Sequence, residues 1–439
     1  MKPSRIFVLR TFTLCSMLLV LVNGDAAHAS TQRAASPVTI VFWDSNNPAE
    51  HNFTKALVNQ WNRMHKDIYV KLQPLPATKT SEEVFLAAIA AHKTPDITNN
   101  LLPAVVPQYS SQGGLYQLDK LPDFISYMHA RMPTGTLEQY RSNDGHYYQV
   151  PWKANPVMII YRPDLLKTAG ISSFPRTYSS LMSALKAIKA RTHINPIFPT
   201  IDPTWYNRWF DFYCFYLAQS NGTKLLDRAA KKSVFQDHGA ARVMSFWRQI
   251  YAQKLAPKSA STADKWKLNQ EAMYIAGPWG PNGEVVTNHA TQPWAVAPIP
   301  VPDGMSAPAY PYTYSDPKNL TIFGNTKHPK EAWEFIKWYI TPQHDAAFLE
   351  ATWEFPYRKQ MVEDPTHFSP IFRQYPQLTQ FAKQLPHVAG LDDTPNFVQM
   401  FTAISDAWES AVVNQSKSPD AAVKDAAKKI DGIVGNAGP

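Results

Sequence analysis

Residues 38–72 read VTIVFWDSNNPAEHNFTKALVNQWNRMHKDIYVKL. The segment Val38–Trp43 is entirely β-branched or aromatic, which predicts a buried strand. The next apolar residues recur at helical spacing: Phe53, Leu57, Trp61 and Met64. Ile68–Leu72 then predicts a second strand. This strand–helix–strand order decides the fold class, because it favours parallel strands covered by a helix.

The same alternation continues along the chain. Thr80 and Glu83 have the spacing of a capping box and predict the start of another helix. Pro95-Asp96-Ile97 predicts the strand after it. Later apolar segments repeat the pattern, with strands expected at 157–161, 273–276, 294–299 and 320–323, and helices expected to open near Thr177, Pro329 and Ser418. A chain of 439 residues is too long for one core, so we expect two lobes.

The first 29 residues have the features of a secretory signal. Basic residues precede an apolar run from Thr11 to Val22, and Ala27-His28-Ala29 is a small-x-small cleavage pattern. Position 30 is serine, whereas a lipoprotein needs cysteine at the cleavage point. We therefore expect release into a periplasm without a lipid anchor.

Charge and cysteine content argue against a nucleic-acid-binding protein and against a disulfide-stabilised one. The formal charge of +8 is spread along the chain, which disfavours a nucleic-acid partner. Only Cys214 would remain after signal cleavage, so no internal disulfide is expected.

The sequence contains none of the common catalytic motifs. The sequence lacks a Gly-x-Ser-x-Gly elbow and a P-loop, and the histidines lie too far apart for a helical metal pair. Cys214 lies between Tyr213 and Phe215, which indicates a buried structural thiol. We expect no catalytic residue, metal ligand or cofactor, although paired carboxylates from distant positions remain compatible with glycoside hydrolysis.

Aromatic residues gather instead where loops are expected. They include Trp43, Trp152, Trp205, Tyr206, Trp279 and Tyr312. An aromatic ring covers the apolar face of a sugar, while carboxylates and amides bond its hydroxyls. For a single ring, packing in the core is the competing interpretation.

Ordered motifs resemble one family over nearly the whole mature chain. They include Thr94-Pro95-Asp96-Ile97, Gly114-Leu115-Tyr116-Gln117-Leu118-Asp119, Tyr161-Arg162-Pro163-Asp164-Leu165 and Ala272–Trp279, which ends Gly277-Pro278-Trp279. These resemble segments of the extracellular solute-binding proteins of ABC importers, of the maltodextrin- and multiple-sugar-binding type.

The resemblance implies a two-lobed α/β periplasmic binding protein of type II-like fold. Each lobe would hold a mixed, mostly parallel sheet flanked by helices, with the ligand cleft between the lobes. The N-terminal lobe would comprise residues 38–153 and 315–355, and the C-terminal lobe 154–314 and 356–439. The implied function is non-catalytic capture of a mono- or oligosaccharide by a monomer that delivers it to inner-membrane permease subunits of an ABC importer.

Candidate ligand contacts follow from the aromatic positions and from the resemblance. They are Trp43, Asp44, Asn47, Asn99, Asn100, Trp152, Asn155, Trp205, Tyr206, Trp279, Tyr312, Asp316, Glu354 and Arg358. Trp279 matches the stacking tryptophan of the family. Two positions depart from the family pattern: Asn155 replaces an acidic residue of maltodextrin binders, and Asp316 stands where many members have a Gly-Gly pair.

Two other functions stay open at this point. Arg358, Lys153 and the basic balance are compatible with a charged solute such as glycerol phosphate. A secreted carbohydrate-active enzyme would use the same aromatic residues.

Overall fold

The computed structural model describes residues 37–435 apart from positions 77–79, 200–201, 228, 259–263, 360 and 362–368. The predicted signal peptide, with its cleavage pattern at Ala27–Ala29, lies outside the described residues. The described residues form one compact unit. In the described part of the chain, no helix is both long and apolar enough to cross a bilayer.

A five-stranded sheet contains the stretch that opens the chain. Its strands, in spatial order, are β2 (Ile68–Pro74), β1 (Val38–Asp44), β3 (Ile97–Leu101), β11 (Lys318–Ile322) and β4 (Val150–Lys153). β1 pairs in parallel with β2 and β3, as the strand–helix–strand order predicted. β11 arrives from much later in the sequence and runs antiparallel to both β3 and β4.

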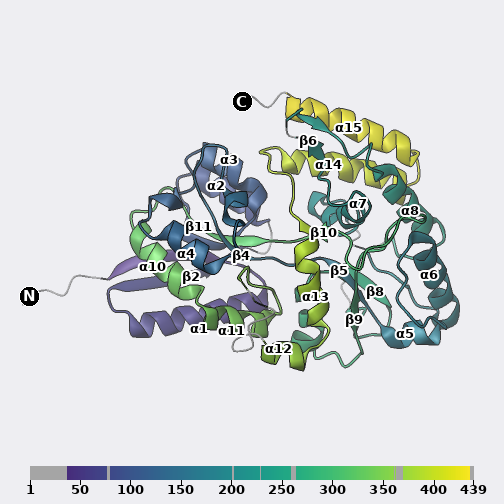
Figure 1. Ribbon diagram of the computed structural model, residues 1–439, viewed down its shortest axis with the longest axis horizontal. Helices are drawn as coiled ribbons and strands as arrows, with labels where there is room; N and C mark the ends of the chain where they lie inside the picture. Colours follow the sequence, from purple (N-terminus) through teal and green to yellow (C-terminus); the bar gives the residue numbers. More distant parts are fainter. Residues whose placement is uncertain are drawn as a thin grey trace, which may run out of the picture. The chain divides into compact units, whose positions relative to one another are not determined.

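Helices pack on this sheet through aromatic residues. The helices of this region are α1 (Pro48–Met64), α2 (Ser81–Ala90), α3 (Val106–Ser111), α4 (Phe124–Arg131), α10 (Pro329–Tyr339) and α11 (Pro342–Thr352). Phe42 of β1 meets Phe335 of α10 edge-on with ring centroids 5.8 Å apart, and Trp61 of α1 meets the same ring at 5.3 Å. Figure 1 shows α1 and α11 side by side, where they also contact each other. The predicted capping box of Thr80 and Glu83 is confirmed at the start of α2.

A three-stranded sheet forms the other main sheet of the described chain. Its order is β8 (Met273–Ala276), β5 (Met158–Tyr161) and β9 (Ala295–Ala297). Both ladders are antiparallel, whereas a mostly parallel sheet was expected. Strand direction is constrained when consecutive strands are joined by one helix. Here more than 100 residues separate β5 from its partner β8, so the sequence pattern did not fix their relative direction.

Helices from two distant stretches surround this second sheet. They are α5 (Pro163–Thr168), α6 (Tyr178–Thr192), α7 (Tyr213–Gln219), α8 (Ala240–Ala252), α12 (Ser369–Gln374), α13 (Leu378–Gln384), α14 (Phe397–Trp408) and α15 (Pro419–Gly435). Figure 1 shows α14 and α15, in yellow, running side by side. Trp408 of α14 packs on Trp247 of α8 at 5.8 Å, which joins the last helices to the middle of the chain.

Segments 153–158, 314–318 and 353–357, which we call the crossing segments, connect the two sheets within the described chain. They lie against one another: Ala154 N donates to Phe355 O at 2.9 Å, and Val157 N donates to Tyr314 O at 2.8 Å. The short strands β10 (Thr313–Tyr314) and β12 (Val388–Ala389) pair beside them. The lobe boundaries expected at these segments remain a prediction.

Candidate functional site

A cavity of about 630 Å³, which we call the aromatic pocket, lies at the edge of the five-stranded sheet where β1, β2 and β3 end. Strand ends of α/β sheets are common ligand sites, and this volume lies within the usual range for ligand pockets. The lining residues are Asn46, Leu75, Pro76, Thr80, Ser81, Glu82, Glu83, Asn100, Thr204, Trp205, Tyr206, Trp209, Phe210, Trp279, Asp316 and Lys318.

Aromatic rings form one wall of the pocket. The 3-10 helix η4 (Trp205–Trp209) supplies most of them, and Trp205 packs edge-on against Tyr206 at 5.6 Å and against Trp209 at 5.2 Å. Phe210 follows η4 and meets the ring of Trp279 at 6.2 Å. The rings therefore support each other, while Trp205, Tyr206 and Trp279 stay only partly buried.

Trp279 owes its position to the glycine beside it. It is the first residue of α9 (Trp279–Asn282), and its ring folds back over Gly277. A Cβ atom on Gly277 would lie 1.9 Å from that ring, so no larger residue fits there. The position of the Trp279 ring therefore requires glycine at position 277.

Charged and amide side chains also line the pocket. Lys318, the first residue of β11, places Nζ 3.2 Å from Oε1 of Glu82 on α2. Asp316 Oδ1 accepts a hydrogen bond from the hydroxyl of Tyr314 at 3.1 Å. Burial raises the pKa of Asp316, and Lys318 partly opposes that shift. Asn100 adds an amide at the end of β3.

This arrangement suits a ligand with one apolar face and a polar rim. Ring faces bury C–H surface, and carboxylate or amide oxygens accept hydrogen bonds from hydroxyl groups. The lining residues include neither cysteine nor histidine. No group of histidine, cysteine or acidic residues among the described positions has the geometry to hold a metal ion.

Five of the predicted contacts line the aromatic pocket together. They are Asn100, Trp205, Tyr206, Trp279 and Asp316. They come from four separate stretches of sequence, and the fold brings them to one cavity. Whether they contact a ligand stays a prediction.

Three predicted residues, one at the end of β1, one after it and one in β3, have partners within the protein. Asn47 caps α1, where its Oδ1 accepts from Ala49 N at 2.9 Å. Asn99 is fully buried and its Oδ1 accepts from Ser45 N at 3.2 Å. Asp44 is also buried and lies 2.9 Å from Nδ1 of His51. Burial raises the pKa of Asp44 to about 7, against the hydrogen bond from His51.

Three predicted aromatic residues lie outside the aromatic pocket. Trp43 stacks on Phe85 at 6.5 Å, and its indole N–H donates to Gln73 Oε1 at 3.1 Å. Trp152 is 1% exposed and packs on Phe348 at 4.5 Å, so it belongs to the core. Tyr312 lines a different cavity of about 550 Å³.

The remaining three predicted residues lie on or beside the third crossing segment. Asn155 and Glu354 are both buried, and Asn155 Nδ2 donates to Glu354 Oε2. Arg358 Nε donates to Asp345 Oδ2 at 2.8 Å, and the same carboxylate pairs with Arg131. These side chains already have partners within the protein.

Several lining residues were not among the predicted contacts. Glu82 is an acidic residue at a predicted helix start, and Lys318 is a basic residue before a predicted strand. Neither pattern indicates a ligand site. Trp209 and Phe210 lie three and four positions after Tyr206. The crowding of rings in that stretch, Trp209 included, was the signal that could have added both to the predicted contacts.

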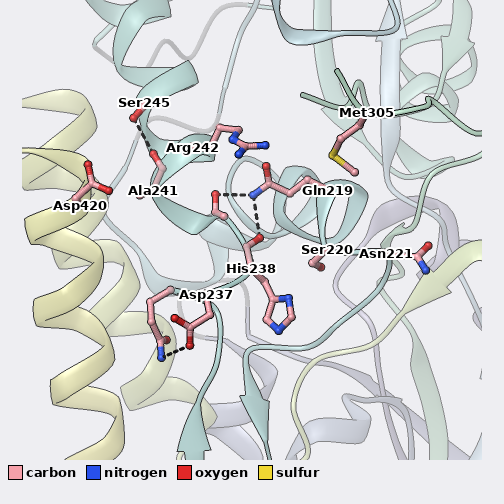
Figure 2. A pocket seen from close by; sticks show the side chains of 12 residues that line it. Gln219, Ser220, Asn221, Asp237, His238, Ala241, Arg242, Ser245, Met305 and Asp420 are labelled. Carbon is pink, nitrogen blue, oxygen red and sulfur yellow. Dashed lines mark hydrogen bonds between the residues drawn. The ribbon is translucent and has the colours of Figure 1, made fainter. Parts of the chain in front are cut away.

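Two further cavities lie among the described residues. Segment 315–318 separates two of the cavities. Asp316 and Lys318 line the aromatic pocket, whereas Ser315 and Pro317 line the cavity with Tyr312. Figure 2 shows a larger cavity of about 710 Å³ between the end of α7, the start of α8 and α15. Its lining is polar and charged, with His238, Arg242 and Asp237, and it holds no aromatic wall.

Comparison with known proteins gives one family and several distant relatives. The sequence matches the family described as bacterial extracellular solute-binding protein over residues 56–380. A binding protein of Brucella abortus is 23% identical over 298 residues, which are 66% of this chain and 69% of that protein. The diacetylchitobiose-binding protein DasA of Streptomyces coelicolor is 20% identical over 363 residues, 80% of this chain and 79% of that protein.

A solved structure supports the fold assignment. The GacH receptor of Streptomyces glaucescens, solved without ligand and with acarbose, has a TM-score of 0.76 and 20% identity, covering 92% of this chain and 100% of that chain. The similarity confirms the expected α/β fold of periplasmic binding proteins, with mixed sheets flanked by helices.

Proposed function

The chain belongs to the bacterial extracellular solute-binding proteins, and from that premise we propose that it captures a sugar or oligosaccharide in the aromatic pocket for an ABC importer. The family consists of binding proteins, which confirms the expectation that the chain is not an enzyme. We place the protein in the periplasm, released by signal cleavage, as a monomer that hands its ligand to permease subunits.

The observation that carries the proposal is the pairing of walls in the aromatic pocket. Trp205, Tyr206 and Trp279 offer ring faces, and Asp316 and Asn100 offer hydrogen-bond acceptors in the same cavity. A saccharide presents the complementary surfaces, a C–H face and a rim of hydroxyls. The diacetylchitobiose-binding relative and the acarbose complex of the similar receptor support the same ligand class.

A phosphorylated or otherwise anionic solute has less support. Recognition of phosphate favours a guanidinium or ammonium group that is free to bind it. Lys318 in the pocket is paired with Glu82, and Lys153 is buried between Glu50 and Glu354. Arg358 is bonded to Asp345. The cations that suggested a charged ligand therefore have carboxylate partners.

Capture and release follow from movement about the crossing segments in this proposal. Glu82 and Asn100 lie with the five-stranded sheet, whereas Trp205 and Trp279 lie with the three-stranded sheet. A ligand that contacts both walls stabilises the arrangement in which they face each other. Binding would thus shift the population toward a closed form, which the importer recognises.

Calorimetric titration with a panel of solutes tests the proposed function. The panel contains diacetylchitobiose, maltodextrins of two to four units, simple hexoses and glycerol phosphate. We expect heat from at least one neutral saccharide, with an affinity that changes little between low and physiological salt, because no ion pair to the ligand is made. Absence of heat from every saccharide, together with salt-sensitive binding of glycerol phosphate, would contradict the proposal.

A further inference from the structure

Four buried polar side chains meet under the crossing segments, and we call them the crossing cluster: Glu50, Lys153, Asn155 and Glu354. Lys153 Nζ lies 2.6 Å from Glu50 Oε2 and 2.9 Å from Glu354 Oε2. Asn155 donates from Nδ2 to Glu354 and accepts from Phe355 N at 3.1 Å. The side chains of Lys153, Glu50 and Glu354 are 2%, 7% and 3% exposed, so water screens these charges little.

The cluster ties together segments that are far apart in the sequence. Glu50 lies in the first turn of α1, Lys153 ends β4, and Glu354 lies two residues after the end of α11. Asn155 also accepts from Asp316 N through its backbone oxygen at 3.0 Å. All three crossing segments therefore meet at Asn155, and one of those bonds leads directly to a residue of the aromatic pocket.

The charges of the cluster do not balance if every group is ionised. Two carboxyl groups face one ammonium, and Glu354 Oε1 is buried without a hydrogen-bond partner. Burial raises the pKa of Glu354 to about 8, the nearby Glu50 adds to the shift, and Lys153 opposes it. Protonation of Glu354 leaves Lys153 paired with one carboxylate, which is the neutral arrangement.

Other charged groups surround the cluster. Asp316 and Lys318 act on Lys153 from the side of β11 with opposite signs. Asp44, paired with His51, acts on Glu50 from the end of β1. Burial also raises the pKa of Asp44 and of Asp316. Within the cluster, Glu354 is the carboxyl group that contacts both Lys153 and Asn155.

We propose that the crossing cluster is a proton-controlled latch, in which protonated Glu354 holds the third crossing segment against Lys153 and Asn155, and ionised Glu354 loosens it by repulsion from Glu50. Lys153, Asn155 and Glu354 are then positioning residues of the hinge, not ligand contacts. The latch acts in the ligand-free protein and does not depend on which solute is bound. Loosening it changes the balance between open and closed forms by weakening the bonds that align the crossing segments.

Amide hydrogen exchange of the ligand-free protein tests the latch. Peptides covering residues 353–357 are compared with peptides covering β2 at about pH 6 and about pH 9, which cancels the intrinsic pH dependence of exchange. In the natural protein we expect exchange in 353–357 to rise at least about tenfold relative to β2. No selective rise would overturn the proposal without recourse to any variant.

Two variants and one control identify the group responsible. Glu354→Gln keeps the shape of a protonated carboxyl group, and the relative exchange of 353–357 should then be the same at both pH values. Glu50→Gln removes the repelling partner and should also suppress the rise, which provides a second measurement if the first variant fails to fold. Glu284→Gln removes a partly buried carboxyl group of raised pKa elsewhere and should behave like the natural protein. Retention of the rise in both glutamine variants of the cluster, or its loss in the control, would overturn the assignment to Glu354.

Discussion

At the residue scale, the pocket depends on individual rings and carboxylates placed by their neighbours. Trp279 could be predicted from its Gly-Pro flank and the family resemblance, and the structure gives the steric reason at Gly277. Glu82 could not be predicted, because an acidic residue in the first turn of a helix is explained by the helix itself. Its place in the pocket depends on Lys318, which is 236 residues later.

Replacement of Trp279 by alanine should weaken binding of the saccharide at least about tenfold, or about 1.4 kcal/mol, because a partly buried ring face is lost from the pocket. The measurement is calorimetric titration of the natural and variant proteins. Trp338→Ala is a matched control, because Trp338 packs against Trp61 and does not line the pocket. If the affinity of the Trp279 variant is unchanged, or if this variant loses thermal stability and the control does not, the ring serves packing and not ligand binding.

At the element scale, helix starts were predictable and strand direction was not always so. The capping box of α2 and the Thr177 cap of α6 were expected from local sequence and are present. Parallel pairing of β1 with β2 and β3 also followed from local order. The antiparallel ladders of β5 depend on partners joined by long connections, so local patterns contained no information about them.

Asn47→Ala should lower the free energy of unfolding by about 1 kcal/mol, because Asn47 caps α1 through bonds to two backbone amides. Denaturant unfolding measures this change. Asn47→Ser keeps a capping oxygen and should retain most of the stability. Loss of ligand affinity in the serine variant, with stability preserved, would show instead that Asn47 contacts the ligand.

At the scale of the whole molecule, the buried carboxyl groups set the pH dependence of stability. Burial raises the pKa of Asp211 to about 7 and that of Glu271 to about 8, and it also raises that of Glu354. Raised carboxyl pKa values mean that the folded state binds more protons than the unfolded state at intermediate pH. Stability from these groups is fully present below their unfolded pKa values and is lost as pH rises toward about 8.

The midpoint of thermal unfolding should therefore be higher near pH 5 than near pH 9, by at least about 2 °C. Scanning calorimetry at a series of pH values measures the difference. Glu271→Gln removes one of the responsible groups, so its midpoint should fall less over the same range. A midpoint that rises steadily from pH 5 to pH 9 would contradict the assignment of these groups.

The sequence indicated only in outline how segments far apart in the chain come together. Two regions of α/β pattern and the family resemblance predicted the general architecture. The contacts of Lys153 with Glu50 and Glu354, which are 103 positions before it and 201 positions after it, could not be read from local patterns. Asn155 and Glu354 were therefore predicted as ligand contacts, whereas in the structure they bond each other.

Mass spectrometry of the solute retained through gentle purification tests the central claim most directly. The natural protein should carry a neutral saccharide that is released on denaturation, and Trp279→Ala prepared in parallel should carry much less. A retained phosphorylated or other non-sugar solute, held equally by both proteins, would contradict capture of a sugar in the aromatic pocket.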